Sequence, residues 1–176
     1  MTGVQTCALP ILDAGPPRVL MVCLGNICRS PTAEGVLRAM ARARGIEVAV
    51  DSAGTAAWHA GSPPDVLSVA HAARRGIDLS GLRARQVRLG DFDSFDLILA
   101  MDHQNLAELV KRCPPEQAHK VRLLLSFAPA WPQDEVPDPY HGGAQGFEHV
   151  LDGIEQACEG LLAQLATPGW QARRAR

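Results

Sequence analysis

The chain has 176 residues, of which 47% are hydrophobic and 20% are charged, as is typical of one globular domain with its own core. Its 17 basic and 19 acidic residues leave a net charge of −2, which gives no reason to expect nucleic acid or an anionic membrane as a partner. No apolar stretch approaches the length of a membrane span. The five cysteines have neither disulfide-like nor zinc-like spacing, and no secretory signal precedes them, so we expect a reducing, cytoplasmic location.

The first residues differ in character from the rest of the chain. The run GVQTCALPI at residues 3–11 has no amphipathic period, lacks the charged start of a signal peptide and resembles a translated sequencing-adapter read-through. We therefore expect residues 1–17 to be a non-native extension with a linker, and we leave Cys7 out of the chemistry. A domain over residues 18–166 and a basic tail over residues 167–176 complete the expected organisation.

Apolar runs and helical periodicities alternate along the rest of the chain. Buried strands are predicted at residues 19–22, 47–52, 95–101 and 121–125. Helices are predicted from Pro31 to Gly45, from the opening segment 61–65 to Gly76, over 103–112 behind the capping residue Asp102, and over 147–165.

Two stretches carry no clear period. Residues 77–87 are expected to be irregular, and residues 128–146 form a long loop rich in Pro and Gly, a kind of loop that is often functional. Alternating strands and helices predict an α/β domain whose parallel sheet has helices on both faces. Ligands of such sheets bind at the carboxyl ends of the strands.

The loop after the first predicted strand carries a thiol and a guanidinium. Cys23 follows the strand, Arg29 comes six residues later, and Pro31 marks the start of a helix. Backbone N–H groups of such a loop and the helix N-terminus would form an anion cradle, which Arg29 can close with a two-pronged hydrogen bond. The positive surroundings would favour the thiolate form of Cys23 and make it a nucleophile. By itself, this spacing also fits a buried small side chain and a solvated arginine.

The segment Cys-Leu-Gly-Asn-Ile-Cys-Arg-Ser-Pro at residues 23–31 resembles the phosphate-binding loop of the low-molecular-weight protein tyrosine phosphatases. Similar segments extend from about Val19 to Leu165. The resemblance implies a single three-layer domain with a four-stranded parallel sheet in the order 2-1-3-4 and the phosphate-binding loop at the end of strand one. It assigns phosphate binding to Leu24, Gly25, Asn26, Ile27, Cys28, Arg29 and Ser30.

Cleaving a phosphate monoester through a cysteine also requires a proton for the leaving oxygen. The segment Asp138-Pro139-Tyr140 lies in the long loop, where an Asp-Pro pair by itself indicates a plain turn. The resemblance implies instead that Asp138 is the general acid and that Tyr140 forms a wall of the substrate pocket. It also implies that Trp58 faces the substrate and that His141 stands in the pocket where many eukaryotic members have a second aromatic residue.

Several supporting roles follow from the same resemblance. Ser52 would hold Asn26, which must take a strained turn conformation, and Ser30 would bond the nucleophilic thiol. At the position of Leu82 family members often carry a histidine that helps to hold the loop asparagine, so this departure puts the rigidity of the loop in question. Cys28 fits either a packing role or a reversible disulfide with the nucleophile.

These residues together predict a phosphotyrosine-protein phosphatase that works through a cysteinyl-phosphate intermediate. Three alternatives stay open: a phosphoarginine-protein phosphatase, for which the resemblance implies Thr in place of Ile27; an arsenate reductase, for which Cys113 and Cys158 are too far apart in sequence; and a phosphoprotein-binding module without turnover. The expected partners are tyrosine-phosphorylated proteins and a cognate tyrosine kinase. We expect no metal or organic cofactor, because the remaining histidines show no metal-ligand spacing: His59, His71, His103, His119 and His149.

Overall fold

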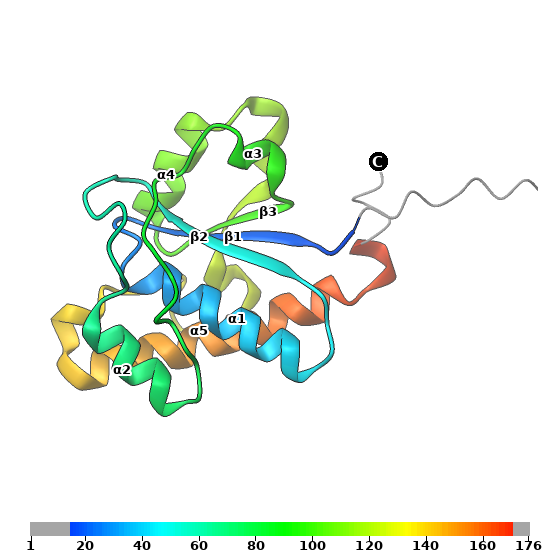
Figure 1. Ribbon diagram of the computed structural model, residues 1–176. Coiled ribbons are helices and arrows are strands. Elements are labelled where there is room, and N and C mark those ends of the chain that lie inside the picture. The colour runs from blue at the N-terminus through cyan, green and yellow to red at the C-terminus, as the bar shows by residue number, and fades with distance from the viewer. Residues whose placement is uncertain (1–14, 171–176) are drawn as a thin grey trace, which may run out of the picture.

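A four-stranded sheet runs through the centre of the computed structural model, which describes residues 15–170 (Figure 1). Its strands are β1 (Arg18–Cys23), β2 (Ala49–Gly54), β3 (Leu97–Ala100) and β4 (Val121–Leu123). They pair in the order β2-β1-β3-β4, and every pair is parallel, which confirms the expected order 2-1-3-4. Because β1 lies between β2 and β3, the winding of the chain reverses at its carboxyl end, where sheets of this kind bind ligands.

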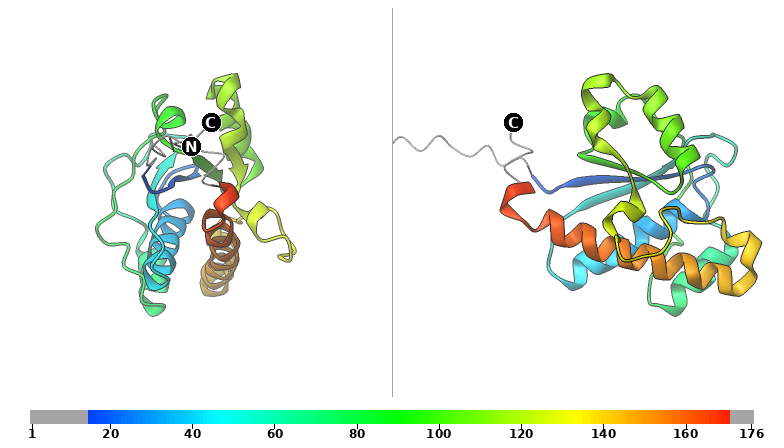
Figure 2. Two further views of the ribbon diagram at one scale, coloured as in Figure 1. Left: turned by 90° about the vertical axis from the view of Figure 1, so that its right-hand side faces the viewer. Right: turned by 180° about the vertical axis from the view of Figure 1, so that it is seen from behind.

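Helices cover both faces of the sheet, as predicted (Figures 1 and 2). On one face α1 (Arg29–Ala43) and α5 (Gly143–Leu165) lie side by side, and α2 (Val66–Arg74) packs against both. On the other face lie α3 (Asp91–Ser94) and α4 (His103–Arg112). Short 3₁₀ helices span Pro115–Lys120, Leu124–Phe127 and Pro139–Gly142. Within residues 15–170, no helix has the length and apolar character needed to cross a membrane.

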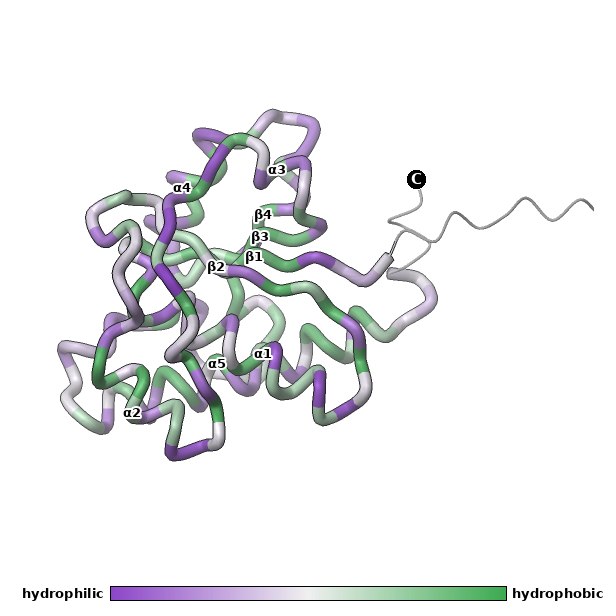
Figure 3. The backbone as a smooth tube through the Cα atoms, viewed as in Figure 1, coloured by the Kyte–Doolittle hydropathy of each residue, from purple (hydrophilic) through white to green (hydrophobic). Residues whose placement is uncertain are grey.

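The side chains of β1 alternate between two hydrophobic cores, as the period of two in a strand requires. Val19, Met21 and Cys23 belong to the core shared with α1 and α5, whereas Leu20 and Val22 belong to the core on the α4 side. The tube in Figure 3 is correspondingly hydrophobic along β1 and β3. This alternation directs the Cys23 side chain to the face of the sheet on which α1 begins.

Most predicted elements exist, but several have different bounds. The helix over 103–112 is confirmed at both ends, and Asp102 caps it by accepting the N–H of Asn105 at 2.7 Å. The run 95–101 forms a strand only at Leu97–Ala100, where it pairs with its neighbours, and α3 was not predicted because four residues show no period. The prediction that a strand extends to residue 125 is wrong, because residues 124–127 form a 3₁₀ helix.

Two helices also begin earlier in the chain than predicted. α1 begins at Arg29, two residues before the predicted start, which still leaves Pro31 in the first turn, where its missing N–H costs no helical hydrogen bond. α5 begins at Gly143, four residues before the predicted start, because its glycine-rich first turn resembles a loop. The non-native extension expected over residues 1–17 falls mainly on residues 1–14, which lie outside the described residues, as do residues 171–176 of the expected tail.

Candidate active site

The loop of residues 24–28 connects the end of β1 to the start of α1 and turns around one sulfur atom. Cys23 is 3% exposed, and its Sγ accepts the backbone N–H of Asn26 at 3.3 Å. Asn26 has φ of 55°, in the left-handed region, where asparagine is tolerated better than most residues; it is the single non-glycine residue with positive φ in the described chain. Since α1 follows directly, the positive end of its dipole lies at the loop.

The segment after β2 holds this loop in place. The backbone N–H of Thr55 donates to the carbonyl of Cys23 at 2.9 Å, and that of Ala56 donates to the carbonyl of Leu24 at 3.0 Å. A Cβ on Gly54 would lie 2.7 Å from the Leu24 carbonyl oxygen, so only glycine permits this close approach.

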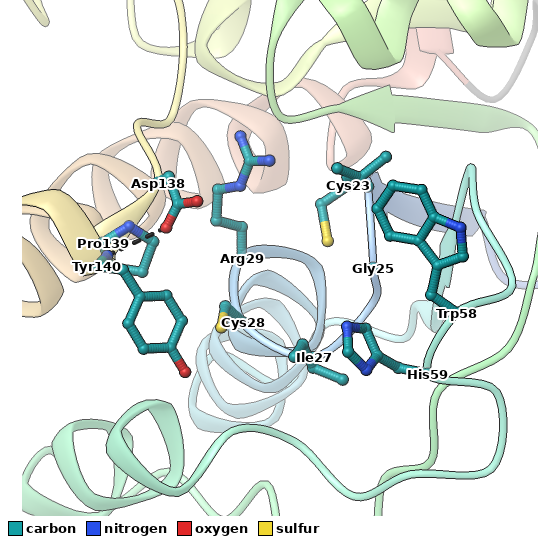
Figure 4. Close-up of a pocket in the computed structure, with 11 residues that line it drawn as sticks. Cys23, Gly25, Ile27, Cys28, Arg29, Trp58, His59, Asp138, Pro139 and Tyr140 are labelled. Atoms are coloured by element: carbon teal, nitrogen blue, oxygen red, sulfur yellow. Dashed lines mark hydrogen bonds between the residues drawn. The ribbon is translucent and has the colours of Figure 1, made fainter.

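A cavity of about 220 Å³ lies in front of the Cys23 thiol (Figure 4). Three segments far apart in sequence form it: the loop after β1, the turn after β2 and the loop before α5. In Figure 4, Trp58 and Tyr140 stand on opposite sides of the cavity and the Asp138 carboxylate lies beside Arg29. The lining residues are Cys23, Leu24, Gly25, Ile27, Cys28, Arg29, Trp58, His59, Asp138, Pro139 and Tyr140.

Buried polar side chains form a hydrogen-bond network behind the thiol. Ser30 Oγ lies 3.0 Å from Cys23 Sγ and accepts a hydrogen bond from Asn26 Nδ2 at 2.8 Å. Asn26 Nδ2 also donates to Ser52 Oγ at 2.9 Å. Asn26, Ser30 and Ser52 are each at most 4% exposed. The structure thus brings these three residues together as the resemblance implies.

Arg29 is anchored through one nitrogen. Its Nη1 donates to Asp102 Oδ2 at 2.7 Å and to the Val136 carbonyl at 2.9 Å, and its side chain is 11% exposed. Within residues 15–170, both hydrogen bonds of the Arg29 guanidinium come from Nη1. The edge formed by Nε and Nη2 is therefore available to a ligand in the cavity. The sequence analysis missed this use of Asp102, although an aspartate two residues after the end of β3 lies at the same sheet edge as Cys23.

Asp138 and Tyr140 belong to the exposed side of the cavity. One carboxylate oxygen of Asp138 accepts the backbone N–H of Tyr140 at 3.1 Å, which fixes the turn that presents both side chains. The Tyr140 hydroxyl donates to Asp65, whose other oxygen caps α2. Burial, followed by this bond to Asp65, raises the pKa of Tyr140 well above its ordinary value, so the ring is neutral at physiological pH.

A family model described as low molecular weight phosphotyrosine protein phosphatase matches residues 18–169. The chain belongs to this family. A low molecular weight protein-tyrosine-phosphatase of Streptomyces coelicolor is 46% identical over 151 residues, covering 83% of this chain and 92% of the relative.

Solved structures of the family agree with the fold. A protein tyrosine phosphatase of Entamoeba histolytica with Hepes in its active site superposes with a TM-score of 0.82 at 40% identity, covering 85% of this chain and 96% of that chain. DARP, a Drosophila arginine phosphatase, superposes with a TM-score of 0.78 at 32% identity, covering 85% and 98% of the two chains. Membership of the family therefore establishes the fold and the class of reaction. The similar proteins differ in the phosphorylated residue that their names give, tyrosine or arginine.

In this low-molecular-weight phosphatase, Leu82 does not leave the loop asparagine without a partner. Asn26 Oδ1 accepts the backbone N–H of Arg85 at 3.0 Å, and its Nδ2 makes the two bonds to serine described above. Leu82 itself packs against the hydrophobic core. A backbone amide three residues along the chain thus supplies one contact to the asparagine, so the loop is held despite the missing histidine.

The residues that line the phosphatase cavity differ from the expected set at two histidines. His141 is exposed and is not among the residues that line the cavity, so its assignment to the pocket stays a prediction. The segment 139–142 is a 3₁₀ helix, in which successive side chains point in different directions, and Tyr140 occupies the side toward the cavity. His59, which the sequence analysis considered only as a metal ligand, lines the cavity beside Gly25, and its position next to Trp58 is the only sequence signal for it.

The second cysteine of the phosphatase loop is a free, partly buried thiol. Desolvation raises the pKa of Cys28 to about 11, so it is protonated near neutral pH. Its side chain lines the cavity on the Tyr140 side. The disulfide with Cys23 implied by the resemblance stays a prediction.

Proposed function

We propose that this protein hydrolyses phosphotyrosine in proteins through a cysteinyl-phosphate intermediate. The observation that carries the proposal is the cavity itself: a buried thiol at its base, an arginine and an aspartate beside it, and an aromatic ring on each side. These are the groups needed to attack a phosphorus atom, neutralise its oxygens, protonate a leaving group and hold an aryl ring.

In the first step the Cys23 thiolate attacks phosphorus in line with the phenolic oxygen. An S–P bond forms as the P–O bond to the aryl group breaks, and Asp138 transfers its proton to the leaving oxygen. The Nε–Nη2 edge of Arg29 and the N–H groups of the loop bind the equatorial oxygens, where charge is spread in the transition state. Ser30, 3.0 Å from the sulfur, stabilises the thiolate before attack and again as it departs.

In the second step water hydrolyses the phosphoenzyme. Asp138, now ionised, accepts a proton from the attacking water; a P–O bond forms, the S–P bond breaks, and inorganic phosphate and the Cys23 thiolate are released. Asp138 recovers its proton, and the enzyme returns to its starting state. Asp138 thus donates a proton in the first step and accepts one in the second.

The lining of the cavity favours an aryl phosphate. Trp58, Tyr140 and the apolar side chain of Ile27 surround the entrance, and aromatic side chains bind a phenyl ring through stacked or edge contacts. An arsenate reductase would need a further pair of cysteines close together near the nucleophile, but Cys113 and Cys158 are buried in other parts of the fold and do not line the cavity.

The expected partners follow from this chemistry. The substrates are tyrosine-phosphorylated proteins, supplied by a tyrosine kinase. We infer a cytoplasmic location, because the mechanism requires Cys23 as a free thiol, the form that a reducing compartment maintains.

The test is hydrolysis of a phosphotyrosine peptide and a phosphoarginine peptide, side by side at mildly acidic pH, with the wild type and Cys23→Ser. We expect release from phosphotyrosine that is lost in Cys23→Ser. Release mainly from phosphoarginine would retain the thiolate mechanism and overturn the substrate, whereas release that survives Cys23→Ser would overturn the mechanism.

A further inference from the structure

One buried charged residue near the loop has no part in the mechanism above. Glu34 lies in α1 and is 3% exposed. Its two oxygens have different partners: Oε2 accepts the Ser52 hydroxyl at 2.6 Å, and Oε1 accepts Arg38 Nη2 at 2.5 Å. Burial raises the pKa of Glu34, while the bonds from Ser52 and Arg38 act in the opposite direction. A buried carboxylate is costly, so its retention here calls for a function.

The carboxylate determines the direction of the next hydrogen bond. An ionised carboxylate only accepts, so the single proton of the Ser52 hydroxyl must point to Glu34. The lone pairs of Ser52 are then left for a donor, and Asn26 Nδ2 supplies it at 2.9 Å. This settles which end of the Asn26 amide faces the serines.

A second contact holds the same orientation from the other side. The backbone N–H of Arg85 can only donate, and it donates to Asn26 Oδ1 at 3.0 Å. With Oδ1 turned toward Arg85, both protons of Nδ2 point to hydroxyl oxygens, one on Ser52 and one on Ser30. The Asn26 amide therefore has one consistent orientation.

Ser30 is the last member of the chain. It accepts from Asn26 at 2.8 Å, which leaves its own proton for either Cys23 Sγ at 3.0 Å or the Ala53 carbonyl at 3.4 Å. The sulfur is the closer acceptor, and a thiolate is also the more strongly charged one. The proton of Ser30 is thus directed at the nucleophile.

We propose that Glu34 is a positioning residue that, together with the backbone N–H of Arg85, sets the direction of the hydrogen-bond chain Ser52–Asn26–Ser30, so that Ser30 donates to the thiolate of Cys23. The inference rests on the proposed function, in which that thiolate is the nucleophile. Arg38 has a part in it as well, because it occupies Oε1 and leaves Oε2 as the acceptor for Ser52.

Replacing Glu34 by glutamine tests direction separately from shape. In Glu34→Gln, Arg38 still only donates, so it takes the amide oxygen and turns the NH₂ group toward Ser52. The buried Ser52 proton then either has no acceptor or turns toward Asn26 Nδ2, which displaces the bond that Asn26 donates. In both cases only the Arg85 backbone still orients the Asn26 amide, so the hold on Ser30 and the thiolate is weakened. We expect kcat/KM for a phosphotyrosine peptide and the rate of Cys23 alkylation by iodoacetamide at mildly acidic pH both to fall about tenfold.

The double variant Glu34→Gln with Arg38→Met reverses this effect. Methionine has no N–H donor, so the glutamine oxygen is free to turn to Ser52 and accept its proton again. We expect the double variant to regain most of the lost rate, whereas a purely structural role for Glu34 predicts a double variant at least as impaired as Glu34→Gln. Arg38→Met alone completes the cycle, and Glu47→Gln, on the exposed surface, is the matched control at wild-type rates.

Three outcomes overturn the inference: wild-type rates in Glu34→Gln, no recovery in the double variant, or wild-type rates in Ser52→Ala, which breaks the same link if Glu34→Gln does not fold. Alkylation does not depend on turnover. If the wild type fails to hydrolyse the peptide, the proposed function fails, and the alkylation rates still decide the direction of the chain.

Discussion

The two sides of the cavity are held by different forces. On the phosphate side, Asn26, Ser30 and Ser52 are buried and joined by hydrogen bonds of 2.8 to 2.9 Å. On the ring side, Trp58 is 74% exposed and Tyr140 is 52% exposed. A bound phosphate would therefore meet donors that are already oriented, whereas an aryl ring would meet side chains that hold little of the fold together. Mutations on the first side should affect both catalysis and stability, and mutations on the second should affect activity alone.

The largest expected effect on the exposed side is that of Asp138→Ala. Without the proton donor, kcat should fall about a hundredfold for an aryl phosphate with a poor leaving group, and less than tenfold for one with a good leaving group. The measurement is kcat across a series of substituted phenyl phosphates. Asp134→Ala is the matched control, because Asp134 is exposed nearby and pairs with His103 outside the cavity. An equal loss across the series would contradict the role of Asp138 as general acid.

On the buried side, Asn26→Ala should lower both activity and stability. It removes the side-chain bonds to Ser30, Ser52 and Arg85, and it puts alanine at a φ of 55°. We expect the free energy of unfolding to fall by about 2 kcal/mol, as measured by denaturant titration. Asn105→Ala is the control: Asn105 is just as buried, but lies outside this network, so hydrolysis should stay at the wild-type rate. An active, fully stable Asn26→Ala would show that the loop does not need its network.

Trp58→Ala should separate binding from stability on the exposed side. Loss of one aromatic contact should raise KM for a phosphotyrosine peptide about fivefold. The free energy of unfolding should change by less than about 0.5 kcal/mol, because the ring is 74% exposed. Trp58→Phe should keep KM close to the wild-type value. A large loss of stability would mean that the two sides of the cavity are not as different as the burial indicates.

The smallest expected effect is a pH dependence from Glu34. Because its folded pKa is raised above the ordinary 4.5, the native state retains a proton that the unfolded state has lost between these two values. Stability from this group therefore falls as pH rises through that window. Parallel denaturant titrations should show the free energy of unfolding of Glu34→Gln rising relative to that of the wild type as the pH increases above 4.5. The opposite slope would mean that the bonds from Ser52 and Arg38 outweigh burial.

Much of the site could be predicted from local sequence. An apolar strand, a loop of Cys-x5-Arg spacing and a helix start are consecutive in the chain, so the position of Cys23 and Arg29 at the edge of the sheet follows from short-range rules. The contributions of Asp138, Trp58 and Tyr140 could not be obtained in that way, because an Asp-Pro pair or a lone tryptophan has no local signature of catalysis. Resemblance to the family supplied them.

The sequence by itself determined the alternation of strands and helices, the helix over 103–112 with its cap at Asp102, and the anion-binding loop, because each depends on residues that are neighbours in the chain. Tertiary structure alone decided that Asp102 also anchors Arg29, that the Arg85 backbone donates to Asn26 while Leu82 packs against the core, and that His59 rather than His141 lines the cavity. These contacts join residues from 34 to 73 positions apart, or depend on which way a 3₁₀ turn points its side chains. Spacing along the chain carries no record of such geometry, which arises only when the sheet order brings the loops together.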